Sequence, residues 1–99
     1  MTRRLVLTRR AEADLREIWS YSFRQWDEAQ ADLYLDQLDD GLQKCRSEPG
    51  KGKQREALRV GYWSRLIRKH VAFYTFDDNE VTIHRVLHGS MEPDEHLEH

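Results

Sequence analysis

The sequence predicts an α+β fold in which a pair of α-helices packs on one face of a single β-sheet. In the first half of the chain, apolar side chains recur at steps of three and four residues, which is the spacing of a helix face. After Ala57 the apolar residues become β-branched and aromatic and occur in short runs, which favours strands. The length of 99 residues suits one hydrophobic core. We therefore expect one domain spanning residues 1–99.

A first strand is expected at the N-terminus. From Arg3 to Leu7, Arg4 and Val6 alternate with Leu5 and Leu7. This period of two is typical of a β-strand.

Two helices follow, each with a suitable N-cap residue. Thr8 precedes the first helix and Asp27 the second, and both side chains can accept a hydrogen bond from the first helical turn. The first helix has an apolar stripe at Ala11, Leu15, Ile18, Ser22 and Trp26, which Trp19 and Phe23 widen. The second has one at Ala31, Leu35, Leu38, Leu42 and Cys45, and it ends before Pro49-Gly50. Helices joined this closely form an antiparallel hairpin.

The second half of the chain predicts about three antiparallel strands. Residues 47–54 contain Pro49, Gly50 and Gly52 and are expected to form a loop. The strand-like runs are residues 57–60, 63–69, 71–76 and 81–87, with a break at Gly61 and a hairpin turn at Asp78-Asn79. Residues 89–99 form a short acidic tail. Its ending, Leu-Glu-His, coincides with a common expression-vector sequence, which would make His99 and Glu98 additions to the native protein.

The charge distribution favours a protein partner over direct binding of nucleic acid. Sixteen Lys and Arg residues against 18 Asp and Glu give a net charge of −2, without the basic excess of a nucleic-acid binder. The segment 51–69 nevertheless holds seven basic residues and one acid, and acidic segments flank it. Complementary charge on a partner protein would suit this pattern, and the alternative is an ordinary solvated surface.

Composition also bears on location and on metals. No apolar run reaches the roughly 20 residues of a membrane span, and the N-terminal apolar stretch is too short for a signal peptide. The single cysteine, Cys45, indicates a reducing compartment, so we expect a cytoplasmic protein, and its place on a helix stripe favours a buried structural thiol. His84 and His88 would share one face of a strand at about 13 Å, too far apart for one metal ion. We therefore predict no metal site and no cofactor.

Several short strings of the chain form a recognisable series. The most specific is Arg85-Val86-Leu87-His88, with Met91 and His96-Leu97 after it. The others are Thr8–Ile18 with Tyr21; Ala31, Tyr34 and Leu38; Glu56–Gly61; and His70–Tyr74. These strings and the order of elements resemble the ParE branch of the ParE/RelE toxin superfamily, and the resemblance runs through nearly the whole chain.

The resemblance implies a non-enzymatic toxin of a bacterial type II toxin–antitoxin system. Such a toxin inhibits DNA gyrase by protein–protein binding and is neutralised by a ParD-like antitoxin in a hetero-oligomer. The residues expected to contact the target are Arg85, His88, Met91 and His96. Those expected to contact an acidic segment of the antitoxin are Trp19, Arg59, Tyr62, Trp63, Arg65 and Arg68. For Arg85 an ion pair inside the domain is the alternative.

A second resemblance indicates a nuclease as an alternative function. Glu56-Ala57-Leu58 and Gly61–Arg65 are similar to the YoeB-type mRNA interferases of the same superfamily, whose site uses a Glu in that string, an Arg after the next His and a terminal His-Tyr pair. Here Glu56 is present, Val71 follows His70, and the His-Tyr end is lacking. RNA cleavage needs a base, an acid and a cation together. The alternative function is thus a ribosome-dependent RNase with Glu56 as base and Arg65 or Arg85 as cation, and a third is a toxin-like fold retaining only binding.

Overall fold

The computed structural model describes residues 2–97 and confirms the predicted α+β architecture. Its helices are α1 (Arg9–Gln25), α2 (Glu28–Ser47) and α3 (Pro93–His96), with a 3₁₀ turn at Pro49–Lys51. Its strands are β1 (Arg4–Leu7), β2 (Lys53–Gln54), β3 (Trp63–Ile67), β4 (His70–Phe76) and β5 (Glu80–His88). The residues suspected of vector origin, Glu98 and His99, lie outside the described range.

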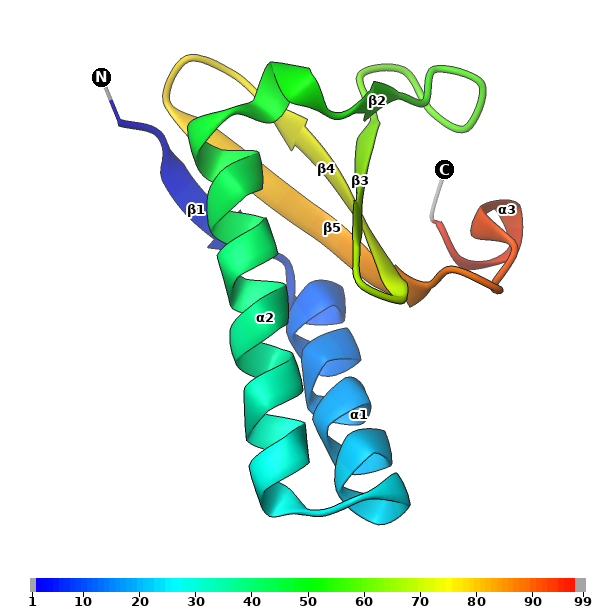
Figure 1. Ribbon diagram of the computed structural model, residues 1–99. Helices are drawn as coiled ribbons and strands as arrows, with labels where there is room; N and C mark the ends of the chain where they lie inside the picture. Colours follow the sequence, from blue (N-terminus) through cyan, green and yellow to red (C-terminus); the bar gives the residue numbers. More distant parts are fainter. Residues whose placement is uncertain (1, 98–99) are drawn as a thin grey trace.

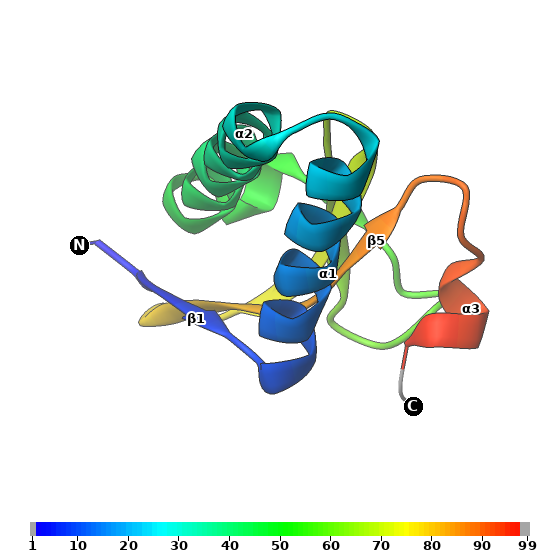
Figure 2. The same ribbon diagram turned by 90° about the horizontal axis from the view of Figure 1, so that it is seen from below.

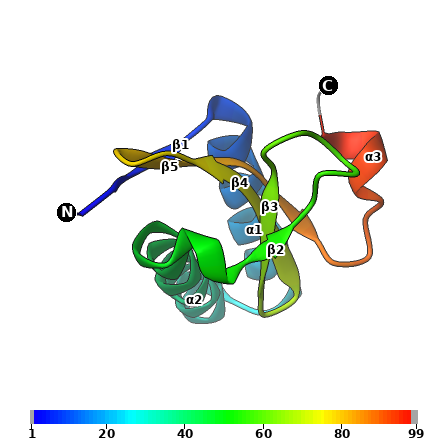
Figure 3. The ribbon, with the colours of Figure 1, turned by 90° about the horizontal axis from the view of Figure 1, so that it is seen from above.

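The helical hairpin and its caps are as the sequence predicts. The Thr8 hydroxyl accepts a hydrogen bond from the Ala11 amide at 3.1 Å, and the Asp27 carboxylate accepts one from the Gln30 amide at 2.8 Å. The two helices run antiparallel (Figure 1), and residues of both pack in one core with the sheet; α2 lies on one side of the strands, and α1 passes beside and behind β5 (Figure 3). The described part of the chain contains no helix long and apolar enough to cross a membrane.

The sheet has the strand order β1-β5-β4-β3-β2. β1 pairs in parallel with β5, and the other neighbours are antiparallel. The first and last strands of the chain are therefore neighbours, and the helical hairpin lies between them in sequence. The core between helices and sheet is formed by apolar residues of both layers, chiefly Ala11, Ile18, Leu38, Leu42, Cys45, Ala72, Tyr74, Val81, Ile83 and Val86.

Two local predictions are wrong in this region. Residues 57–60 form turns rather than a strand. The backbone carbonyls of Arg55 and Arg59 accept hydrogen bonds from amides of the same loop, and Gly61 turns the chain with a φ of 82°. Lys53 and Gln54, expected in a loop, form β2 against Ser64 and Trp63.

The predicted helix stripe is wrong at the far end of α1. Trp26 is 60% exposed and Phe23 is 48% exposed. Figure 1 shows the reason, since the turn of the hairpin extends beyond the sheet and no strand covers it.

A β-bulge changes which side chains of β5 share a face. Phe73 pairs with Arg85 and Tyr74 pairs with Ile83, so His84 is an extra residue on β5. Strict alternation would place the Arg85 side chain on the same face as Ile83, but the extra residue places the two side chains on opposite faces. The prediction that His84 and His88 share a face is wrong for the same reason. His84 stacks on Tyr62, whereas His88 lies against His70.

Candidate functional site

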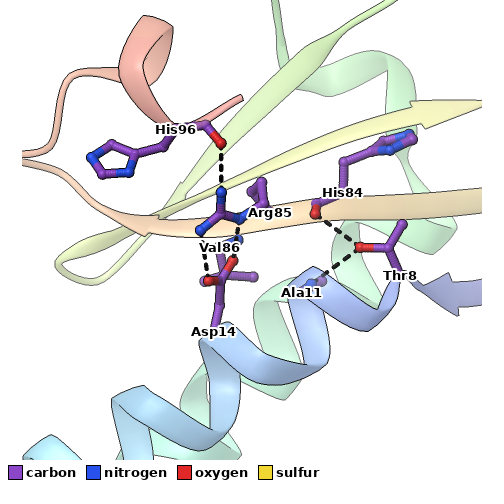
Figure 4. Close-up of polar contacts among 7 residues, drawn as sticks. All are labelled: Thr8, Ala11, Asp14, His84, Arg85, Val86 and His96. Atoms are coloured by element: carbon purple, nitrogen blue, oxygen red, sulfur yellow. Dashed lines mark hydrogen bonds and ion pairs between the residues drawn. The ribbon is translucent and has the colours of Figure 1, made fainter. Parts of the chain in front are cut away.

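The outer edge of β5 is closed by side chains of α1. β1 ends where Leu7 pairs with Ile83, so the rest of β5 has no strand beside it on that edge within residues 2–97. The Thr8 hydroxyl donates a hydrogen bond to the His84 carbonyl at 2.9 Å, and the Val86 amide donates one to the Asp14 carboxylate at 2.9 Å. Figure 4 shows both contacts along the strand. Buried backbone groups need such partners.

Arg85 lies at the centre of this edge. Its Nε donates to Asp14 Oδ2 at 2.8 Å and its Nη2 to Oδ1 at 2.9 Å, while Nη1 donates to the His96 carbonyl (Figure 4). The Arg85 and Asp14 side chains are only 12% and 13% exposed. Arg85 thus joins β5, α1 and α3. The ion pair inside the domain that was the alternative role for Arg85 is therefore present. Its acid, Asp14, comes from α1, and the C-terminal tail supplies the His96 carbonyl.

A cleft of about 480 Å³ opens beside the Arg85–Asp14 ion pair, between α1 and the end of β5. Its α1 wall includes Ile18, Tyr21 and Trp26, and its other wall includes His88 and Met91. Tyr21 is 56% exposed and Met91 is 38% exposed, and Trp26 is the most exposed of the three. Large apolar side chains around a concave site are typical of a protein-binding surface.

Two histidines and a tyrosine also line the cleft. The Tyr34 hydroxyl accepts a hydrogen bond from the Lys69 amide and lies 2.7 Å from His70 Nδ1, to which it can donate. The rings of His70 and His88 meet edge to face with centroids 5.3 Å apart. Burial, with a smaller effect of His88, lowers the pKa of His70 to about 4. His70 is therefore uncharged at neutral pH.

The structure brings together three of the residues expected to contact the target. Arg85, His88 and Met91 line one cleft, and His96 contributes its backbone carbonyl to Arg85. Sequence reasoning did not identify Asp14 as the partner of Arg85. It also assigned Trp26 to the core stripe. The position of Trp26 directly before the second N-cap, at the end of the hairpin, is the signal that could have placed it outside the sheet.

The residues expected to contact the antitoxin are divided between two faces. Arg65 and Arg68 line a groove against α2. On the other face of the sheet, Tyr62 is buried beside Phe73, Leu87 and Leu97, with the Arg59 guanidinium 5.7 Å from its ring centre.

Trp63 packs against the helix-side core, and Trp19 stacks on Phe23 and donates a hydrogen bond to Asp32 at 2.9 Å.

The structure places the three residues of the alternative nuclease on different elements. Glu56 is exposed in the loop after β2, Arg65 lies on the α2 side, and Arg85 is held by Asp14. This loop and α3 are neighbours in Figures 2 and 3, and on this face of the sheet Leu58, Val71 and Leu97 belong to one apolar cluster.

Cys45 is completely buried, and burial raises its pKa to about 11. A thiol of this kind is a poor nucleophile at neutral pH. Within residues 2–97, no cluster of three or more His, Cys, Asp or Glu side chains is arranged to hold a metal ion.

Comparison with known proteins places this fold in a family. A family model described as the ParE toxin of the type II toxin–antitoxin system parDE matches residues 5–93. Toxin ParE1 of Caulobacter vibrioides is 42% identical over 91 residues, covering 92% of this chain and 94% of that one. A chromosomal ParDE toxin–antitoxin system from P. aeruginosa superposes with a TM-score of 0.77 at 18% identity, covering 88% of this chain and 96% of that one.

The likeness to the interferase branch is one of fold. The YoeB dimer from Staphylococcus aureus superposes with a TM-score of 0.63 at 20% identity, covering 89% of this chain and 98% of that one. The family match covers nearly the whole sheet and hairpin and all of the residues that line the cleft. The chain belongs to the ParE family of toxins of type II toxin–antitoxin systems.

Proposed function

We propose that this toxin inhibits DNA gyrase in the cytoplasm by protein–protein binding, without catalysing a reaction. The observation that carries the proposal is the cleft beside β5, where the large apolar side chains of Tyr21, Trp26 and Met91 are exposed. Such a site offers apolar anchors to a protein partner. Phosphodiester cleavage needs its groups within hydrogen-bond reach of one substrate, and the engagement of Arg85 by Asp14 argues against Arg85 as the cation of such a site.

Within this proposal Arg85 and His96 position the target surface, and His88 and Met91 contact the target. The Arg85 guanidinium is already bound by Asp14 and the His96 carbonyl, so its role is to hold α3 and residues 89–92 in place.

The same proposal includes neutralisation by a ParD-like antitoxin in a hetero-oligomer. The cations of segment 51–69 would meet an acidic segment of that antitoxin. Family membership and the shared fold with the P. aeruginosa ParDE system support this partner.

A supercoiling assay with purified gyrase tests the target. Wild-type toxin should abolish supercoiling, and the antitoxin encoded beside it should restore it. Undiminished supercoiling at a large molar excess of toxin would exclude gyrase as the target.

A further inference from the structure

The cleft beside β5 carries one charge that nothing else in the described part of the chain balances. Its lining includes the carboxylates of Asp14 and Glu17 and the guanidinium of Arg85. Asp14 and Arg85 are paired with each other at 2.8 Å. Glu17 is exposed, and within residues 2–97 its side chain has no ion pair or hydrogen bond. The rim of the cleft therefore presents an unpaired carboxylate.

The sequence of α1 explains why the Glu17 carboxylate is unpaired. Side chains three and four positions apart are neighbours on a helix surface. Around Glu17 these positions hold Ala13, Asp14, Ser20 and Tyr21, and none of them is a cation. The helix thus leaves this carboxylate to solvent or to a partner.

The two histidines of the cleft do not supply a compensating positive charge. His70 is uncharged at neutral pH, because burial lowers its pKa to about 4. The Ser90 amide donates a hydrogen bond to His88 Nδ1 at 3.1 Å, so this nitrogen carries no proton in the arrangement observed. The cleft consequently combines large apolar side chains with a net negative charge.

The backbone of β5 beside the cleft is already engaged within the chain, which restricts the form of a partner. The His84 carbonyl is bound by the N-cap side chain of α1, and the Val86 amide is bound by Asp14. The His88 carbonyl accepts a hydrogen bond from the Met91 amide at 2.9 Å. A partner that added as a strand would need these same groups. A helix satisfies its own backbone and needs only space for side chains, so the cleft favours a helix.

We propose that the cleft binds a helical segment of the target whose inserted face carries apolar side chains and a lysine or arginine. The apolar side chains contact Tyr21, Trp26 and Met91, and the cation pairs with Glu17. This assignment rests on the proposed inhibition of gyrase and states the chemistry of the gyrase segment. The apolar contacts supply most of the affinity, and the charge pair selects among helices of similar shape.

A second copy of this chain fits the cleft less well than a basic helix does. Two copies related by a two-fold axis place the same surface against itself. The Glu17 carboxylates of both copies would then lie in one interface without a cation between them, and like charges at an interface are unfavourable.

Charge reversal at Glu17 tests the proposal in a supercoiling assay with purified gyrase. We expect Glu17→Gln to weaken inhibition about two- to fivefold and Glu17→Lys at least about tenfold, because lysine would repel the cation of the target. Asp39→Lys is the matched control, since Asp39 is an exposed acid of α2 that does not line the cleft. It should inhibit as the wild type does, and circular dichroism should show that all three variants fold.

The outcomes distinguish the helix proposal from the gyrase proposal. Equal inhibition by Glu17→Lys and Asp39→Lys would overturn the charge pair and leave gyrase inhibition intact. A wild-type toxin that does not inhibit gyrase would overturn both. Loss of antitoxin binding in Glu17→Lys with full inhibition of gyrase would assign the cleft to the antitoxin and overturn the proposal.

Salt dependence separates a charge contact from a change in packing. The affinity of wild-type toxin for gyrase should fall as salt rises from about 50 mM to about 300 mM, because salt screens exposed charge pairs. The fall should be smaller for Glu17→Gln. Parallel salt dependences of the two proteins would contradict a cation opposite Glu17.

Photo-cross-linking identifies the segment that occupies the cleft. A benzophenone amino acid introduced at Tyr21 or at Met91 would lie on opposite walls. Both probes should label gyrase within about eight residues of each other, which is about two helical turns, in a segment that contains a lysine or arginine. Labels in separate segments, a labelled segment without a cation, or no labelling by probes that still inhibit would each overturn the proposal.

Discussion

Asp14 holds Arg85 through both carboxylate oxygens, and the same carboxylate accepts the Val86 amide at the edge of β5. One acidic side chain of α1 thus satisfies a guanidinium and a strand edge together. Removing one partner of a buried pair leaves the other charge unpaired.

The Asp14→Asn variant should therefore lose about 2–4 kcal/mol of unfolding free energy, measured by urea denaturation. Arg4→Ala is the matched control, because the Arg4–Glu80 pair is exposed and should contribute less than about 1 kcal/mol. Equal losses in the two variants would contradict the structural role of Asp14.

Cleft variants should weaken toxicity with little change in stability. Trp26→Ala and Met91→Ala remove exposed side chains from the rim, so their melting temperatures should change little. Gyrase inhibition should fall at least about tenfold if these side chains anchor the target. Leu33→Ala is the control, since Leu33 is 50% exposed but does not line the cleft. Full inhibition by both rim variants would remove the cleft from the target surface.

His70 should make the domain less stable in acid. Its pKa is about 4 in the folded chain and near 6.5 when unfolded, so the unfolded state takes up a proton first as pH falls. The contribution is complete above about pH 6.5 and is lost toward pH 4. Because solvent partly screens the ring, we expect wild type to lose about 1–2 kcal/mol more than His70→Gln between these values. Parallel denaturation curves for the two proteins across this pH range would contradict the assignment.

A translation extract tests the nuclease alternative. A reporter mRNA should remain intact in the presence of the toxin, because Arg85 is bound by Asp14 and Arg65 lies in a groove against α2. Transcript cleavage that disappears in Glu56→Ala would reverse this conclusion.

Cys45 should resist alkylation in the folded protein. Burial keeps the thiol protonated and covered at neutral pH. Mass spectrometry should show at least about 100-fold slower reaction with iodoacetamide in buffer than in denaturing urea. Rapid modification of the native protein would show that α2 opens easily.

Most of the local elements could be predicted from the sequence, whereas the register and pairing of distant strands could not. Thr8 and Asp27 act through neighbouring amides, so their capping roles are readable from adjacent residues. The bulge at His84 depends on how β5 meets Phe73 and Tyr74, which no local pattern encodes. It reverses the expected faces after Ile83.

The candidate site shows the same division. His88 and Met91 follow the family pattern and do line the cleft. Asp14 lies 71 positions from Arg85 in sequence, and only the parallel pairing of β1 with β5 brings α1 beside it. Trp26 follows the helical spacing of the core stripe but lies past the end of the sheet, which the spacing cannot reveal.

The parallel pairing of β1 with β5 has a consequence for synthesis on the ribosome. Residues 4–7 emerge from the ribosome before their strand partner, residues 80–83, because the helical hairpin and three strands lie between the two in sequence. Until that partner leaves the exit tunnel, the apolar sides of α1 and α2 have no completed sheet to cover them, and Asp14 has no Arg85. The sheet, and with it the cleft beside β5, is therefore completed only after β5 has been synthesised.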